Sequence, residues 1–108
     1  MTHKAKKVVI ITEKVIVDRV LKIVEDAGAT GYTVSAVGGK GSRNVRSEDR
    51  PKIVDALSNV QIEAIVGADD VANRIAEEVA DTFFTNYSGI TYLEEVEILR
   101  PHKFGADD

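Results

Sequence analysis

The sequence contains no cysteine and no tryptophan, and aromatic residues make up only 6% of its 108 positions. Without cysteine the chain has no disulfide framework, no thiolate metal site and no cysteine nucleophile, which fits a reducing compartment. The basic N-terminus is followed by an apolar run of four residues, Val8–Ile11, which is too short for a signal peptide or a membrane span. We therefore expect a cytoplasmic protein.

An excess of positive charge is also missing. The formal net charge is −4, whereas domains that hold nucleic acid usually carry surplus lysine and arginine. The chain has no KGFGFV-like run of aromatic residues on which RNA bases could stack. With 44% hydrophobic and 30% charged residues, the composition is that of one folded domain over residues 1–108. No nucleic-acid partner is expected.

Hydrophobic periodicity predicts four strands and two helices in the order β-α-β-β-α-β. One helix should begin after Thr12 as its cap and end at Gly28, and the other should be capped by Asp69 or Asp70. This order is the ferredoxin-like split βαβ arrangement, an α+β fold with both helices on one face of a four-stranded antiparallel sheet. The expected strands cover Lys6–Ile11, Tyr32–Val37, Val60–Val66 and Ile90–Leu99.

The outer strands predict that the second face of this sheet is apolar too. Apolar residues occur in both registers, as in the pairs Val8 with Val9, Ile10 with Ile11 and Ile98 with Leu99. A monomer would expose a larger apolar patch than soluble proteins normally tolerate. We expect this face to be buried against other copies of the chain.

A long basic loop, GGKGSRNVRSEDRPK, separates the second and third predicted strands. Residues 38–52 carry five basic and two acidic side chains, a local charge of +3 on a chain whose remainder carries −7. Glycines with Lys40, Arg43 and Arg46 suit phosphate, although the loop matches neither a Walker A motif nor GxGxxG. By pattern alone a solvated loop is as good an interpretation. Three arginines within eight residues favour an anionic ligand or an acidic partner.

Other chemistry finds little support in the sequence. Glu94 and Glu95 are adjacent on a predicted strand and face opposite ways, so they form no catalytic carboxylate pair. His3 and His102 lie near opposite ends without metal-ligand spacing. No serine or threonine stands in a triad-like constellation. We expect no catalytic residue and no metal site, and the turn NYSG before the last strand is most simply a turn.

Four segments resemble PII-like signalling proteins of the SbtB type, partners of the sodium-dependent bicarbonate transporter SbtA. They are TEKVI, GATGYTV, GGKGSRNVRS and NYSGITYLEEVEIL, and the likeness runs from about Lys7 to Leu99. It implies a homotrimer with adenine nucleotides (cyclic AMP, AMP, ADP or ATP) in the clefts between subunits. The residues that would meet the phosphates are Lys40, Gly41, Ser42, Arg43 and Arg46. The residues near the adenine and ribose would be Thr33, Val34, Gly89 and Ile90.

The same resemblance implies how the protein would signal. The T-loop, about residues 39–52, would bind the transporter in inorganic-carbon sensing, as part of a carbon-concentrating mechanism, and would recruit the protein to the membrane. No cofactor would be permanently bound, and Mg²⁺ is expected, if at all, only with ATP. Residues 101–108 would form a flexible tail. The partner-binding residues would be Arg43, Asn44, Val45, Arg46 and Ser47.

Two departures from related patterns narrow the function. The chain lacks the GDGK-type phosphate loop and the uridylylatable tyrosine of nitrogen-regulatory PII proteins, so 2-oxoglutarate sensing is not expected. It also lacks the CGPEGC-like tail associated with nucleotide hydrolysis in some relatives, so we expect no enzyme. Two alternatives remain open, a slow ATP or ADP hydrolase and a trimeric metal-tolerance protein of the CutA kind, although the latter lacks clustered metal ligands.

Overall fold

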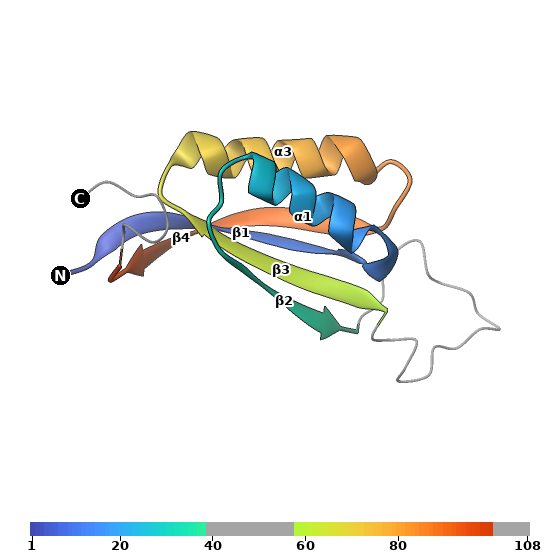
Figure 1. Cartoon of the computed structure of the whole chain (residues 1–108), viewed down its shortest axis with the longest axis horizontal. Coiled ribbons are helices and arrows are strands. Elements are labelled where there is room, and N and C mark those ends of the chain that lie inside the picture. The colour runs from blue at the N-terminus through green and yellow to red at the C-terminus, as the bar shows by residue number, and fades with distance from the viewer. Residues whose placement is uncertain (39–57, 101–108) are drawn as a thin grey trace.

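The computed structural model describes residues 1–38 and 58–100, which form one sheet with two helices on a single face (Figure 1). The sheet order is β2-β3-β1-β4, and every neighbouring pair is antiparallel. This confirms the predicted ferredoxin-like α+β fold, and the second strand pairs with the third. The elements are β1 (His3–Glu13), a 3-10 turn η1 (Lys14–Ile16), α1 (Val17–Asp26), β2 (Tyr32–Val37), β3 (Asn59–Val66), α3 (Asp69–Phe83) and β4 (Gly89–Ile98).

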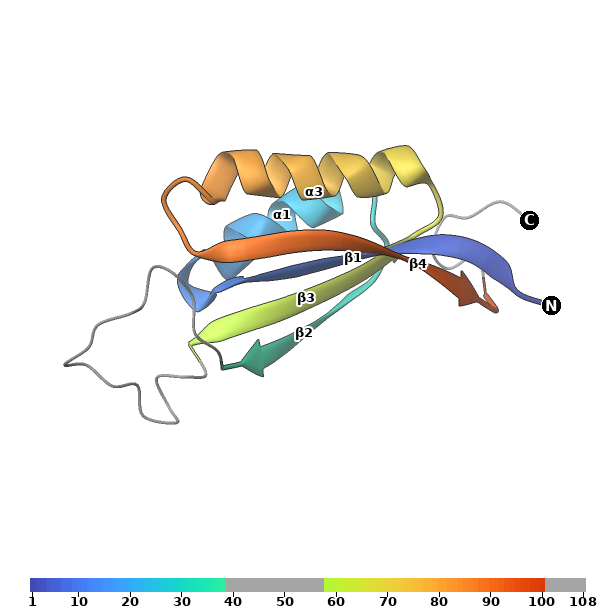
Figure 2. The same cartoon turned by 180° about the vertical axis from the view of Figure 1, so that it is seen from behind.

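The core lies between the sheet and the two helices. Side chains alternate between the faces of a strand, so β1 and β3 each direct every second residue toward the helices. Val8 and Ile10 of β1 and Ile62 of β3 are fully buried there, against Val20 of α1 and Ile75 of α3. The amphipathic pattern of both helices therefore meets the alternating pattern of the central strands in one cluster (Figure 2).

The strand β2 is less buried than its sequence predicts. Alternating apolar and polar residues in Tyr32–Val37 are typical of a half-buried strand, but its four central residues are exposed and only its ends are partly covered. The reason is its place at the edge of the sheet, where β3 is its one neighbouring strand among residues 1–38 and 58–100. Alternation in the sequence thus identified the strand correctly, but it did not predict burial at an edge.

The predicted caps of both helices are wrong. Thr12 belongs to β1 and bonds elsewhere, and the chain enters α1 through η1 without a side-chain cap. Ala68 occupies the N-cap of α3, while Asp69 and Asp70 lie in its first turn. There their charges still favour the positive end of the helix dipole.

Gly28 ends α1, as predicted, and does so through a left-handed backbone. Its φ is 107°, a conformation that side chains disfavour. Its N–H bonds the carbonyl of Glu25 and the N–H of Ala29 bonds that of Val24, which is the Schellman arrangement. Arg74 of α3 donates from Nη2 to the carbonyl of Ala27 at 2.9 Å, so a cation from the second helix completes the end of the first.

On the face of the sheet away from the helices, β1 and β4 carry apolar side chains, as predicted, whereas β3 adds the polar residues Gln61 and Glu63. Val9 is buried on it by its neighbours, whereas Ile90 and Tyr92 of β4 are 56% and 41% exposed. Leu99, predicted within the last strand, lies just beyond its end at Ile98. Lys7 and Glu94 form an ion pair of 3.1 Å across this face. Burial of the face against other copies remains a prediction.

No helix within the described residues is both long and apolar enough to cross a bilayer.

Thr91 provides a test of the core. Its Oγ1 is buried and has no hydrogen-bond partner among the described residues, although its backbone pairs with Ile10 in the sheet. A buried hydroxyl without a partner costs about 1–3 kcal/mol. Thr91→Val should therefore raise the free energy of unfolding by about 1 kcal/mol in a denaturant titration. Thr82→Val makes the same chemical change at an exposed site of α3 and should change stability little. Lower stability of the Thr91 variant would show that its hydroxyl has a partner.

The apolar face predicts self-association. Tyr92→Lys should reduce the molecular mass measured by light scattering toward that of one chain, because the lysine ammonium would be desolvated in an apolar contact. Val15→Lys is the matched control, since Val15 is 75% exposed on η1, away from this face. An unchanged mass for both variants would place any assembly contact elsewhere.

Candidate functional site

The residues predicted beside adenine and ribose lie at opposite edges of the sheet. Thr33 and Val34 belong to β2, and Gly89 and Ile90 belong to β4. Two strands, β3 and β1, separate them. Three strand spacings of about 4.8 Å put the two groups ~14 Å apart across the sheet. One chain does not bring these four residues together, so a common site needs β2 of one chain and β4 of another.

Both groups lie toward the same end of the sheet. The pairing registers align Ile90 with Ile11, Ile11 with Gln61 and Gln61 with Ser35, only one or two residues from Val34 and Thr33. At this end β2 finishes, β3 begins and the α3–β4 turn enters the sheet (Figures 1 and 2). The phosphate-binding and partner-binding candidates lie outside the described residues, namely Lys40, Gly41, Ser42, Arg43, Asn44, Val45, Arg46 and Ser47.

Gly89 is required by its surroundings. A Cβ at this position would lie 2.5 Å from Cζ of Phe84 and 2.9 Å from Oγ1 of Thr12. Both distances are far below van der Waals contact, and the Phe84 ring packs against the core. Any larger residue would push β4 away from β1 or displace that ring. The sequence singled out Gly89 only through the family resemblance, and the structure adds this steric reason.

The backbone carbonyl and the backbone N–H of Ser88 both form hydrogen bonds with side chains at the end of β1. Its carbonyl accepts a hydrogen bond of 2.7 Å from the Thr12 hydroxyl, and its N–H donates to Glu13 Oε2 at 2.6 Å. The Thr12 side chain is almost completely buried, with 2% of the residue exposed. Sequence reasoning missed these contacts, because it assigned both residues to the start of a helix.

The same stretch of chain also contacts the start of β3. The backbone N–H of Lys14 donates to the carbonyl of Ser58 at 2.9 Å. Ser58 is the residue at which the described chain resumes after the basic loop. Two adjacent segments are therefore bound by consecutive residues of β1 and η1. Thr12 and Glu13 bond to Ser88 in the α3–β4 turn, and Lys14 bonds to Ser58 at the start of the segment that leads into β3.

A cation packed on two aromatic rings supports the turn from the helix side. The Arg19 guanidinium carbon lies 5.3 Å from the ring centre of Phe83 and 5.7 Å from that of Tyr87. Arg19 Nη2 also donates to the Tyr87 hydroxyl at 3.2 Å, and the two rings meet edge to face. Such contacts contribute about 0.5–1 kcal/mol at exposed sites. They connect α1 to the segment that leads into Gly89.

Two titratable side chains on the sheet, Lys7 of β1 and Tyr32 of β2, form hydrogen bonds with nearby carboxylates. A hydrogen bond to Glu94, assisted by the charge of Glu63, raises the pKa of Lys7 above its ordinary value. A hydrogen bond to Glu25 raises the pKa of Tyr32, whose hydroxyl donates to that carboxylate and so ties β2 to α1. Both residues are partly exposed, and an upward shift of either pKa leaves Lys7 charged and Tyr32 neutral near pH 7. Neither acts as a proton carrier there.

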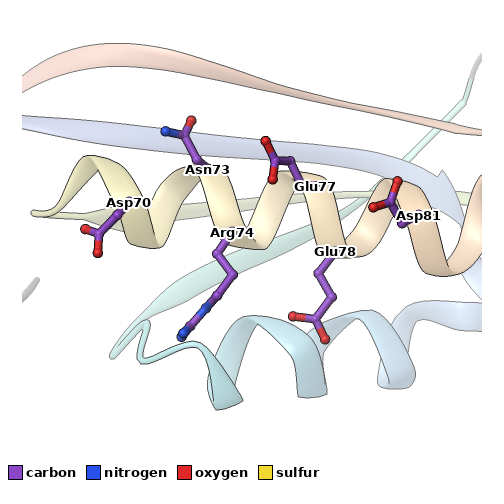
Figure 3. A pocket seen from close by; sticks show the side chains of 6 residues that line it. All are labelled: Asp70, Asn73, Arg74, Glu77, Glu78 and Asp81. Atoms are coloured by element: carbon purple, nitrogen blue, oxygen red, sulfur yellow. The ribbon is translucent and has the colours of Figure 1, made fainter.

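A shallow hollow on α3 has the wrong charge for a nucleotide. Figure 3 shows its lining along one helix, with Arg74 reaching toward the end of α1. Arg74 is occupied by the carbonyl of Ala27, and the other ionisable groups are all carboxylates. The lining residues are Asp70, Asn73, Arg74, Glu77, Glu78 and Asp81. In residues 1–38 and 58–100, no three His, Asp or Glu side chains gather closely enough to hold a metal ion.

Several solved structures of other proteins share this fold. A PII-like signalling protein from Thermus thermophilus is 31% identical, with a TM-score of 0.77 over 95% of this chain and 97% of that one. CPII from Thiomonas intermedia, in a structure bound to ADP and bicarbonate, is 26% identical with a TM-score of 0.80, covering 96% of this chain and 97% of that one. A further CPII structure, bound to ADP, AMP and bicarbonate, shares the fold at 24% identity, a TM-score of 0.78 and 97% coverage of each chain.

The sequence matches the family described as nitrogen regulatory protein P-II over residues 5–103, nearly its whole length. The match includes all four strands to their ends except the first two residues of β1, and both helices. The chain therefore belongs to the P-II family, and the solved proteins it is similar to are PII-like signalling proteins.

Proposed function

We propose that this chain binds adenine nucleotides (AMP, ADP, ATP and cyclic AMP) in clefts between the subunits of a homotrimer. Through the T-loop, about residues 39–52, it regulates a sodium-dependent bicarbonate transporter of the SbtA type. The observation that carries the proposal is the placement of Thr33 and Val34 at one edge of the sheet and of Gly89 and Ile90 at the other. A cleft that uses both edges needs two chains.

The chemistry of the loop supports the choice of ligand. The described surface around α3 is acidic and would repel a nucleotide, whereas Lys40, Arg43 and Arg46 supply positive charge at the start of the loop. The related protein CPII has been solved with ADP and bicarbonate, which supports both the nucleotide and the link to inorganic carbon. The protein would reach the membrane through its transporter.

The proposed signal is a change in the population of loop states. A phosphate that neutralises Arg43 and Arg46 favours one arrangement of the loop, and the fraction of molecules able to bind the transporter changes. A ligand shifts this balance only by its difference in affinity for the two states. Cyclic AMP and ATP differ in charge and length, so they should act differently. We propose a binding module and no hydrolase, with Mg²⁺ accompanying ATP alone.

The first test is calorimetry with the four nucleotides and with adenosine. Arg46→Ala should lower the binding affinity for AMP, ADP, ATP and cyclic AMP by about ten- to a hundredfold. This is the range expected for the loss of one charged hydrogen bond. Adenosine, which has no phosphate, should change little. Lys22→Ala removes an exposed cation paired with Asp26 on α1 and serves as the control. Absence of binding by the wild type would end the proposal.

The second test asks whether two chains build each cleft. Arg46→Ala damages the loop side, and Ile90→Ala removes apolar contact area on the exposed β4 side without placing a charge on the apolar face. Trimers reassembled from an equal mixture of these two variants should regain about one intact cleft in four, because random mixing pairs the undamaged edges that often. Calorimetric stoichiometry and affinity measure this recovery. A mixture that binds no better than its parents would place the whole site within one chain.

A further inference from the structure

The end of β1 contacts both segments that frame the candidate site. Thr12 and Glu13 bond the Ser88 carbonyl and N–H, and the next backbone N–H, that of Lys14, bonds Ser58. The contacts to Ser88 join positions 75 and 76 residues apart in the sequence. We call residues 12–14 the β1 bracket.

Side-chain hydrogen bonds from the β1 bracket take the place of backbone pairing just beyond the end of the β1–β4 ladder. The ladder between β1 and β4 ends with Thr12 opposite Gly89, so Ser88 lies just outside it. At Ser88 the two side chains of the bracket supply the donor and the acceptor that a continuing strand would have supplied. The direction in which the chain enters β4 is therefore set by side chains.

The direction of entry matters because β4 is an edge strand. One side of it pairs with β1, and on the other side alternate backbone N–H and C=O groups point away from the sheet. On the helix side of the sheet, Phe84 and Thr12 fill the space in which a Cβ of Gly89 would lie, so this position has little room to move toward the core. Movement of Ser88 by a fraction of an ångström would thus move the exposed edge of Gly89 and Ile90.

We propose that Thr12 and Glu13 are positioning residues for the nucleotide, holding the adenine-side edge of β4 in place relative to Ser58 at the base of the loop. They act through Ser88 and do not touch the ligand. Arg19, packed on Phe83 and Tyr87, holds the opposite side of the same turn. This inference rests on the proposed nucleotide site, and it assigns a role that the basic loop does not supply.

The test compares two variants that remove the bracket with one that keeps it. Thr12→Val removes the hydroxyl at nearly constant shape, Glu13→Ala removes the acceptor, and Thr12→Ser retains the hydroxyl. We expect Thr12→Val and Glu13→Ala to lower the binding affinity for AMP and for adenosine equally, by about tenfold. Thr12→Ser should bind as the wild type does. Arg46→Ala, by contrast, should weaken AMP and spare adenosine.

A second measurement distinguishes positioning of β4 by the bracket from a general effect of the bracket on stability. Ile75→Val removes one methyl group from the core, far from the bracket, and should lower the melting temperature without changing affinity. In the free protein, the backbone amide shifts of Ser88 and Gly89 should move in Thr12→Val and Glu13→Ala but not in Ile75→Val.

The outcomes distinguish the two proposals. A wild-type protein that binds neither AMP nor adenosine defeats the nucleotide site and this inference together. A wild type that binds, with affinities unchanged in Thr12→Val and Glu13→Ala, defeats the inference alone. Loss of AMP binding with adenosine spared would also overturn it, because the bracket would then act on the phosphate side.

Discussion

The central position of β1, paired with β3 on one side and β4 on the other, is the constraint on which the rest of this structure depends. It places Val8 and Ile10 in the middle of the core, where both helices can cover them. It also forces β2 and β4 to opposite edges. Each edge carries part of the candidate nucleotide site, and a sheet in this order does not close on itself. If these residues form one site, the strand order by itself requires that a second chain complete it.

Charge is distributed unevenly between the helix side of the sheet, its opposite face and the basic loop. The helix side is acidic along α3, and its one arginine in the hollow is occupied in ending α1. On the opposite face of the sheet, apolar side chains lie along β1 and β4, whereas β3 places Gln61 and Glu63 there. The apolar part of this face suits contact between copies better than contact with an anion. Positive charge is concentrated in residues 38–52. A phosphate would thus be attracted to this segment of the chain.

Much of the fold could be predicted from the sequence because its signals are local. Alternation in residues 60–66 and the apolar spacing along residues 71–83 report directly which side of each element meets the core. Gly28 could be recognised as a helix end because only a residue without a side chain adopts its φ easily. Burial of β2 was overestimated, since alternation does not tell an edge strand from a central one. The caps failed because Thr12 can bond a distant carbonyl as well as a nearby N–H.

By itself, then, the sequence determined the order of the elements, the apolar residues on both faces of β1 and the basic chemistry of the loop, all of which depend on neighbouring residues. Tertiary structure alone decided that Thr12 and Glu13 hold Ser88, that Gly89 has no room for a side chain, and that Arg19 packs on Phe83 and Tyr87. These contacts join residues far apart along the chain. Their existence depends on how β1, α1 and β4 are brought together, and no short-range pattern encodes that.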